Sequence, residues 1–313
     1  MTEVLLTAVE LGVPRSLVDG PASTAAVAAA TGTDSTRLER LLRALQAARI
    51  VTFENGEWAL TPVGRELAPP ASGNGETLVT YAEGLRATMF PAWARLADVI
   101  RGREPLRYPV DEVYDRLIAA ATVALGLVDV VVKSVELPTG ARVADIGGGL
   151  GHTAEALVAA RPDISVVLVE LPATAERAAA RVQRLGLASK IQVIPFVGQH
   201  QLEPLADRCL LARVVVTLDH AAAVDVLRFA RRSLSANGRL EVIDFEADGT
   251  PGAAFGDLMT LARSGGGVRS QDEWRELAAE AGFRLAAGRL IVSPFVHLSF
   301  ECNPEPEREE HGV

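Results

Sequence analysis

The pattern of apolar and polar positions changes character near residue 140. Beyond it, short apolar, β-branched runs alternate with stretches of helical periodicity, a pattern that predicts a parallel sheet covered by helices. The predicted strands are 141–146, 164–170, 190–196, 209–216, 239–245, 285–292 and 295–302, and the predicted helices are 152–160, 173–185, 221–234 and 270–281. We therefore expect an α/β domain over residues 138–302, followed by a charged tail, 303–313.

The first 78 residues follow a different pattern. Two helices are predicted, the second over 37–48 with leucines on one face, and a hairpin with the turn Asn55-Gly56 follows them. This order is typical of a winged helix. Because the region holds nine acidic and six basic residues, it offers a poor surface for DNA phosphates, and we favour an oligomerisation role over DNA binding. A low-complexity linker, 69–75, ends the region.

Residues 79–137 are predicted to be mostly helical. They hold a large share of the few aromatic side chains, namely Phe90, Trp93, Tyr108 and Tyr114. These side chains either pack the helices together or form the wall of a pocket for a flat, apolar ligand. The sequence leaves both interpretations open.

The composition of the 313-residue chain narrows the classes of function. A net charge of −9 argues against a nucleic-acid surface. Its two cysteines exclude a disulfide framework, and no spacing of His, Asp and Glu suggests a metal site. The N-terminus lacks the basic region of a signal peptide, and no apolar run free of charge reaches membrane-spanning length. We expect a cytoplasmic protein without membrane or nucleic-acid partners.

A glycine-rich loop follows the first predicted strand of the α/β domain. The strand ends in Asp145, and glycines at 147, 149 and 151 precede a helix. Glycines allow the backbone to approach a ligand closely, and the amides at a helix start favour an anionic group such as a carboxylate. The next strand ends in Glu170, whose carboxylate can accept hydrogen bonds from both hydroxyls of a ribose. Together these features indicate S-adenosylmethionine.

Several short motifs occur in order between residues 8 and 302. Besides the glycine loop they are Leu11-Gly-Val13, Leu17–Pro21, Glu170-Leu-Pro172, Arg213-Val214, Gly238-Arg-Leu240, Asp257-Leu-Met259, Gly265–Arg269, Glu273-Trp274 and Ala281-Gly-Phe283. With this set, the chain resembles the bacterial and plant small-molecule O-methyltransferases that carry an N-terminal winged-helix dimerisation domain. The resemblance implies a Rossmann-like sheet of seven strands with an antiparallel last strand, and a homodimer.

The resemblance also implies roles for individual residues. Asp145 and the three glycines would surround the methionine part of the cofactor, Glu170 would hold the ribose, and Leu171 would lie against the adenine. The full cofactor-binding set is Asp145, Gly147, Gly149, Gly151, Glu170, Leu171, Gln199 and Arg213. The acceptor pocket would be lined by Phe90, Trp93, Val216 and Met259.

The chain departs from the family pattern where acid–base chemistry is expected. Val216 occupies the position of the usual catalytic histidine, and Val268 that of a supporting glutamate. No acid follows the third strand of the domain, in 195–200, where the family keeps one near the adenine. Two residues are candidates for a substitute base: His220, for which an exposed helix-start role is the favoured alternative, and Asp244, for which the alternative is a helix cap or a surface salt bridge.

These observations support three hypotheses of function. The first is an S-adenosylmethionine-dependent methyltransferase that modifies N, C or O of a small secondary-metabolite acceptor without the usual histidine. The second is a methyltransferase scaffold reused for a non-methylating reaction such as a cyclisation or rearrangement, with the cofactor structural or absent. The third, a transcriptional regulator, is disfavoured by the acidic N-terminal region.

Overall fold

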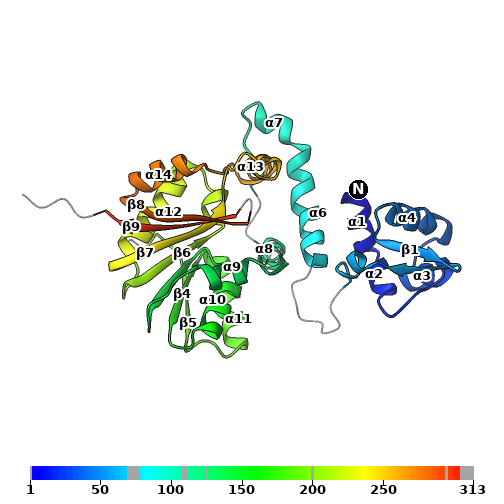
Figure 1. Ribbon diagram of the computed structural model, residues 1–313, viewed down its shortest axis with the longest axis horizontal. Helices are drawn as coiled ribbons and strands as arrows, with labels where there is room; N and C mark the ends of the chain where they lie inside the picture. Colours follow the sequence, from blue (N-terminus) through cyan, green and yellow to red (C-terminus); the bar gives the residue numbers. More distant parts are fainter. Residues whose placement is uncertain are drawn as a thin grey trace, which may run out of the picture. The chain divides into compact units, whose positions relative to one another are not determined.

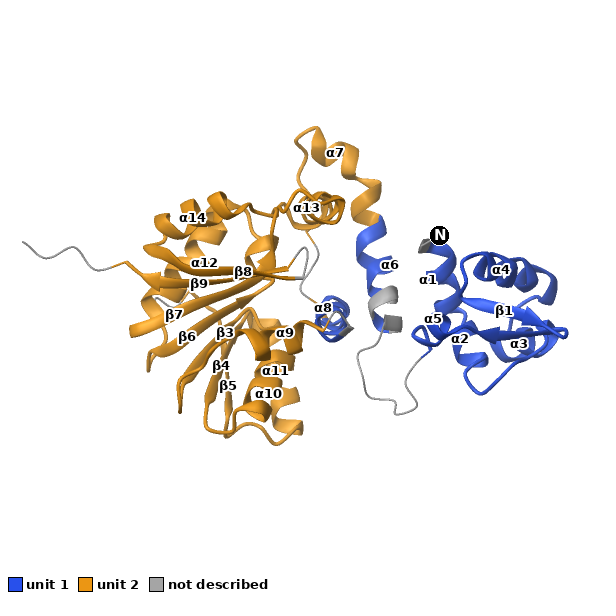
Figure 2. Ribbon diagram, viewed as in Figure 1, with its two compact units in different colours: residues 1–90, 112–125 blue, residues 91–111, 126–313 orange. Residues whose placement is uncertain are grey.

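The structure is a computed structural model that describes residues 2–68, 78–107, 111–124, 126–198, 201–292 and 295–303. The chain forms two compact units, the first of residues 1–90 and 112–125, the second of 91–111 and 126–313 (Figure 2). The sequence pattern predicted a single helical region over 79–137, whereas the structure divides its helices between the two units.

The first unit contains the predicted helices and hairpin. Its elements are α1 (Thr2–Glu10), α2 (Val13–Ser16), α3 (Thr24–Thr31), α4 (Ser35–Ala47), β1 (Val51–Glu54), β2 (Glu57–Leu60), α5 (Pro62–Arg65), α8 (Glu112–Ala124) and α6 (Leu78–Ala94) as far as residue 90. Asp34 caps α4, since its carboxylate accepts from the Arg37 amide at 2.9 Å. The hairpin turns at Asn55 and Gly56, with φ of 51° and 86°, as a two-residue turn of this sequence requires.

The second unit is built on a seven-stranded sheet of order β5-β4-β3-β6-β7-β9-β8 (Figure 1). Its strands are β3 (Arg142–Ile146), β4 (Ser165–Glu170), β5 (Ile191–Pro195), β6 (Ala206–Ala212), β7 (Leu234–Phe245), β8 (Phe283–Val292) and β9 (Phe295–Cys302). The first five are parallel, and β9 runs antiparallel to both β7 and β8. The predicted fold class is confirmed. Because the strand order reverses between β3 and β6, ligands are expected at the carboxyl ends of these strands.

Helices cover both faces of this sheet (Figure 1). One apolar core joins the sheet to α9 (Leu127–Ser134), α10 (His152–Ala160) and α11 (Pro172–Arg184). A second core, on the other face, joins it to α12 (His220–Ser233) and α14 (Gln271–Glu280). The unit also contains α7 (Leu96–Ile100), the one-turn helix η1 (Val215–Thr217) and α13 (Pro251–Ser264).

Two elements differ from the sequence prediction. The strand predicted to reach residue 216 ends at Ala212, because Arg213 adopts a left-handed φ of 59° and the chain then forms η1. Helix α13 was not among the helices predicted from periodicity, although the family resemblance placed Met259 on a helix. Both differences lie at the carboxyl side of the sheet, next to the candidate site. Of the described helices, none by itself has the length and apolar composition needed to span a membrane. The bent pair formed by α8 and α9 together reaches that length and apolar composition, which is the only property it shares with a membrane span.

Candidate cofactor and acceptor site

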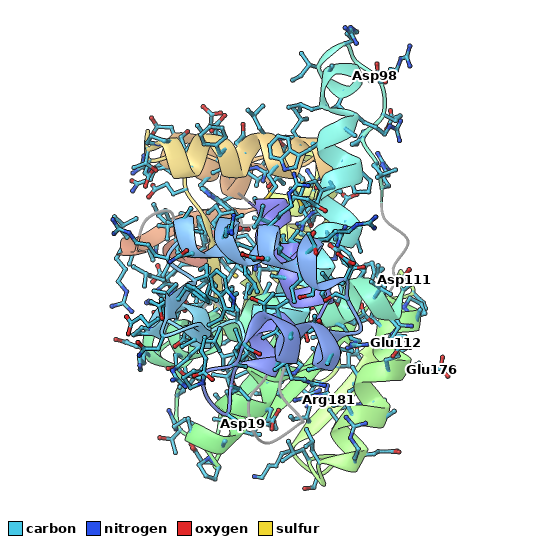
Figure 3. All side chains as sticks on the ribbon, turned by 90° about the vertical axis from the view of Figure 1, so that its right-hand side faces the viewer. Asp19, Asp98, Asp111, Glu112, Glu176 and Arg181 are labelled. Carbon is cyan, nitrogen blue, oxygen red and sulfur yellow. The ribbon has the colours of Figure 1, made fainter. Side chains whose placement is uncertain are left out.

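The glycine loop between β3 and α10 has the backbone that its sequence predicts. Gly147, Gly149 and Gly151 have φ of 73°, 59° and 83°, in the left-handed region that favours glycine. The loop is tied to its neighbours, because the Gly147 amide donates to the Val169 carbonyl at 2.8 Å. Arg181 of α11, labelled in Figure 3, also donates to the Leu150 carbonyl at 3.4 Å.

Gly148 is needed for a reason that was not predicted from the sequence. A Cβ atom at this position would lie 2.2 Å from Asp145 Oδ2 and 2.6 Å from Leu168 Cδ1. Such contacts are too short for any side chain, so the loop passes directly over the carboxylate. In the sequence, the run of three consecutive glycines at 147–149 was the only indication that position 148 also requires glycine.

Asp145 is the buried acid of the site. Its side chain is fully inaccessible, and neither carboxylate oxygen has a hydrogen-bond partner in the described part of the chain. Burial, and secondarily the charge of Glu170, raises the pKa of Asp145 to about 7. An inaccessible carboxylate without donors is costly. The family resemblance places the methionine end of the cofactor beside this acid, whose carboxylate is covered by the Gly148 backbone.

Glu170 ends β4 beside the glycine loop. Its Oε1 accepts from the Gly149 amide at 2.9 Å and its Oε2 from the Leu171 amide at 2.7 Å. Each carboxylate oxygen has two acceptor sites, so these contacts orient the group and leave capacity for ribose hydroxyls. The adjacent Leu171 side chain is 46% exposed, as an apolar surface for a planar base requires.

Val216, which the family resemblance places at the position of the usual base, lies in η1 and is 3% exposed. Its amide donates to Asp244 Oδ2 at 2.9 Å, and Oδ1 of the same carboxylate accepts from the Phe245 amide at 2.9 Å. Burial raises the pKa of Asp244 to about 6, while these amides and the charges of Arg213 and Arg269 act in the opposite direction. Asp244 therefore holds the η1 backbone, and a role in proton transfer stays a prediction.

Arg269 holds the same segment from the other side. Its guanidinium donates from Nη1 to the Val215 carbonyl at 2.9 Å and from Nη2 to the Leu218 carbonyl at 3.1 Å, and it lies 5.8 Å from the centre of the Trp274 ring. Burial lowers the pKa of Arg269, and Asp244 opposes this shift. The motifs of the sequence include this arginine, but its role was not predicted from them.

His220, the other candidate for a substitute base, lies at the start of a helix. His220 begins α12, where its Nε2 lies 2.9 Å from Glu280 Oε2 and its side chain is 67% exposed. Asp219 caps α12, since its carboxylate accepts from the Ala222 amide at 2.9 Å. This arrangement supports the helix-start interpretation of His220 and gives no support to its catalytic role.

Of the predicted cofactor and acceptor residues, Arg213 follows β6, and its guanidinium lies 5.4 Å from the centre of the Phe245 ring. Met259 lies half-buried on α13, which packs against η1. On α6, Phe90 and Trp93 are 38% and 37% exposed and belong to different units. Gln199, together with Tyr108, lies outside the described residues. Among the described side chains, no group of three His, Cys, Asp or Glu is placed to hold a metal.

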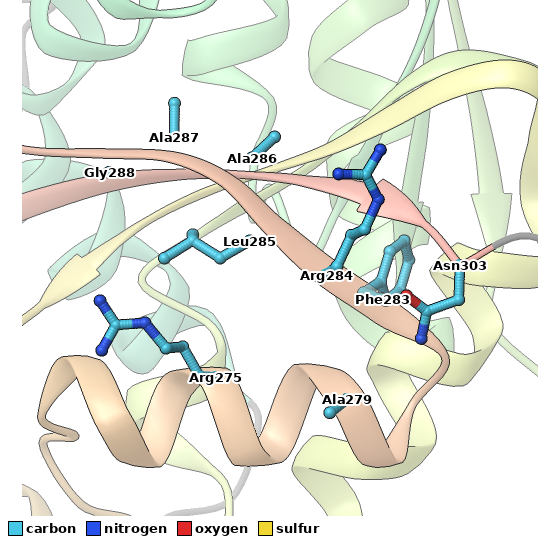
Figure 4. A pocket seen from close by; sticks show the side chains of 9 residues that line it. All are labelled: Arg275, Ala279, Phe283, Arg284, Leu285, Ala286, Ala287, Gly288 and Asn303. Carbon is cyan, nitrogen blue, oxygen red and sulfur yellow. The ribbon is translucent and has the colours of Figure 1, made fainter.

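A surface pocket elsewhere in the second unit is distinct from this site. It is lined by α14 and the edge strand β8, including Arg275, Phe283 and Arg284 (Figure 4). In the sheet order, β6, β7 and β9 separate this edge from β3. The pocket therefore does not include the glycine loop or Glu170.

The pKa of Asp145 predicts a measurable effect on stability. The usual pKa is 3.8, so between about pH 4 and pH 7 the folded chain retains a proton that the unfolded chain has lost, and stability falls as pH rises. The full shift corresponds to about 4 kcal/mol. We expect Asp145→Asn to raise the free energy of unfolding of the ligand-free protein at pH 8 more than at pH 5, measured by urea titration. Equal destabilisation at both pH values would contradict the assignment.

The fold and the site together define the class: a Rossmann-like methyltransferase domain with an antiparallel last strand and an acid–glycine loop at its switch point. A sequence profile of the O-methyltransferase domain matches residues 110–284, and one of the O-methyltransferase dimerisation domain matches residues 1–70. The chain belongs to this O-methyltransferase family, so the family predicted from the motifs is confirmed.

Individual proteins agree with this assignment. The chain is 32% identical to the 8-amino-8-demethylriboflavin N,N-dimethyltransferase of Streptomyces davaonensis, covering 90% of this chain and 86% of the relative. It is 30% identical to the mitomycin biosynthesis 6-O-methyltransferase of Streptomyces lavendulae, covering 89% of this chain and 84% of the relative. The structure of the mitomycin 7-O-methyltransferase MmcR superposes with a TM-score of 0.83 at 27% identity, covering 96% of this chain and 94% of that one. NcsB1 is an O-methyltransferase from neocarzinostatin biosynthesis that was solved with S-adenosylmethionine and 2-hydroxy-5-methyl naphthoic acid. It superposes with a TM-score of 0.75 at 25% identity, covering 96% of this chain and 95% of that one.

Proposed function

We propose that the protein transfers a methyl group from S-adenosylmethionine to a nitrogen or carbon nucleophile, or to an already acidic hydroxyl, of a small aromatic metabolite. The cofactor supplies a methyl group made electrophilic by its sulfonium. Asp145 would accept hydrogen bonds from the methionine end, and Glu170 would accept them from the ribose. Leu171 offers an apolar surface to the adenine. The dimerisation-domain match supports a homodimer, and the cytoplasmic location stays a prediction.

Buried Val216 carries the proposal about the acceptor. A phenol with a pKa of about 10 reacts poorly at neutral pH unless a base removes its proton, which contributes about 10²–10⁴-fold to the rate. Valine cannot accept a proton, and both oxygens of the nearby Asp244 already accept backbone amides. An amine or a stabilised carbanion needs no such base, because positioning against the methyl group is sufficient. Relatives that methylate nitrogen and oxygen on this scaffold are compatible with either acceptor atom.

The pH dependence of turnover tests this proposal. We expect an arylamine to react about 10²-fold faster at pH 7 than the phenol with the same ring, and the phenol rate to rise about tenfold per pH unit up to pH 9. Val216→His should raise the phenol rate at pH 7 and leave the amine rate nearly unchanged. A wild-type phenol rate that equals the amine rate and is independent of pH would contradict base-free transfer. A product without an added methyl group would favour the non-methylating alternative.

A further inference from the structure

Arg263, near the end of α13, is largely buried and has no hydrogen-bond or ion-pair partner among the described residues. Its side chain is 7% exposed, and its Nε atom is inaccessible with no hydrogen-bond partner. No hydrogen bond or ion pair of its guanidinium is found within the described ranges of the chain. Arg269, six residues later, shows the contrast, since it donates to three backbone carbonyls and lies over Trp274.

An inaccessible Nε–H without an acceptor is unfavourable, because its loss of hydration is not compensated by a hydrogen bond. The position of Arg263 in the last turn of α13 gives a favourable interaction with the helix dipole. That interaction leaves the Nε–H without an acceptor, and no acidic side chain of the described residues pairs with the guanidinium. An anionic ligand would supply both the acceptor and the opposite charge.

The position of Arg263 on α13 relates it to the site of methyl transfer. It lies one helical turn beyond Met259, on the same face of the helix. One turn before Met259, a Cβ on Gly256 would meet no described atom within 4 Å, so this face has open space. Three residues after Arg263, a Cβ on Gly266 would lie 2.2 Å from the Val216 carbonyl oxygen. The end of α13 is thereby fixed against η1.

We propose that Arg263 binds a carboxylate of the acceptor, so that the acceptor is a small aromatic acid. This inference rests on the proposed function and specifies its substrate class. A guanidinium suits this task because its planar fork pairs with both oxygens of a carboxylate, and pairing is strong where water is excluded. Arg263 acts here as a binding residue that orients the acceptor beside Val216, and it takes no part in proton transfer.

The test compares two probes that differ only in the carboxylate, 3-hydroxy-2-naphthoate and 2-naphthol. Binding is measured by calorimetry to the protein with and without S-adenosylhomocysteine. We expect the naphthoate to bind at least tenfold more tightly than the naphthol. Arg263→Met should remove this preference, and Arg263→Lys should retain part of it. Affinity for S-adenosylhomocysteine should be unchanged in both variants.

Thermal unfolding separates a binding role from a structural one. Because Arg263→Met removes an inaccessible Nε–H that has no acceptor, we expect the variant to unfold at the same or a higher temperature than the wild type. A lower unfolding temperature with an unchanged preference between the probes would show that the arginine stabilises the fold, and would overturn the proposal. Absence of naphthoate binding, or an equal affinity for both probes in the wild type, would overturn it as well. Failure of the proposed function has a different signature, namely a wild-type protein that does not bind S-adenosylhomocysteine.

Discussion

Replacing Glu170 with alanine is expected to lower the affinity for S-adenosylhomocysteine by at least about a hundredfold. The carboxylate would accept two ribose hydroxyls, and hydrogen bonds to a charged acceptor contribute about 1.5–3 kcal/mol each. The substitution also releases the Gly149 and Leu171 amides that the carboxylate now holds. Calorimetric titration of the purified variant measures the effect.

Two variants make this result interpretable. Glu170→Gln keeps one carbonyl oxygen and the same shape, so its affinity should fall between those of the wild type and the alanine variant. Glu280→Ala removes an acid from α14 that pairs with His220, and it should leave cofactor affinity unchanged. If Glu170→Ala binds as tightly as the wild type, the ribose is held elsewhere.

The second large effect is expected for Gly148→Ala. The added methyl group would lie 2.2 Å from Asp145 Oδ2 and 2.6 Å from Leu168 Cδ1, so the carboxylate or the loop must move. Overpacking of this kind costs about 1–3 kcal/mol of stability. We expect a lower midpoint in thermal unfolding and the loss of saturable S-adenosylhomocysteine binding, because the loop can no longer pass over Asp145.

Gly252→Ala is the matched control for this substitution. The change is chemically identical, and the new Cβ would meet only Thr250 Oγ1, at 3.9 Å. Since alanine also favours the helical backbone of α13, stability should be unchanged or slightly higher. Equal behaviour of the two alanine variants would refute the steric argument for Gly148.

The sequence predicted most of the second unit because its strands are buried on both faces. A continuous apolar run such as 164–170 has the length and the β-branched side chains of a central strand, and Asp145 and Glu170 follow from their positions at the ends of such runs. The periodicity did not predict helix α13, although the family resemblance placed Met259 on a helix after Asp257 and Leu258. Proline is favourable in the first turn of a helix, and Thr250 provides the cap, accepting from the Ala253 amide at 3.3 Å.

The contacts around Val216 could not be predicted from the chain. A run of β-branched residues at 214–216 favours a strand, but the left-handed Arg213 and the hydrogen bond from the Val216 amide to Asp244 redirect it into η1. Asp244 and Arg269 lie 28 and 53 residues beyond Val216, and their contacts depend on tertiary packing. The sequence named Asp244 as a candidate base and placed Arg269 in a motif, and only the structure shows that both bind the same segment.

Asp244 and Arg269 hold η1 from two sides through its main chain, so the backbone position of η1 does not depend on which side chain stands at residue 216. Both residues bind main-chain groups, the Val216 amide and the Val215 and Leu218 carbonyls, and neither contact depends on the side chain at position 216. The course of the backbone through η1 is therefore set independently of the side chain at position 216, so Val216→His is expected to change the chemistry of this position and leave η1 in place.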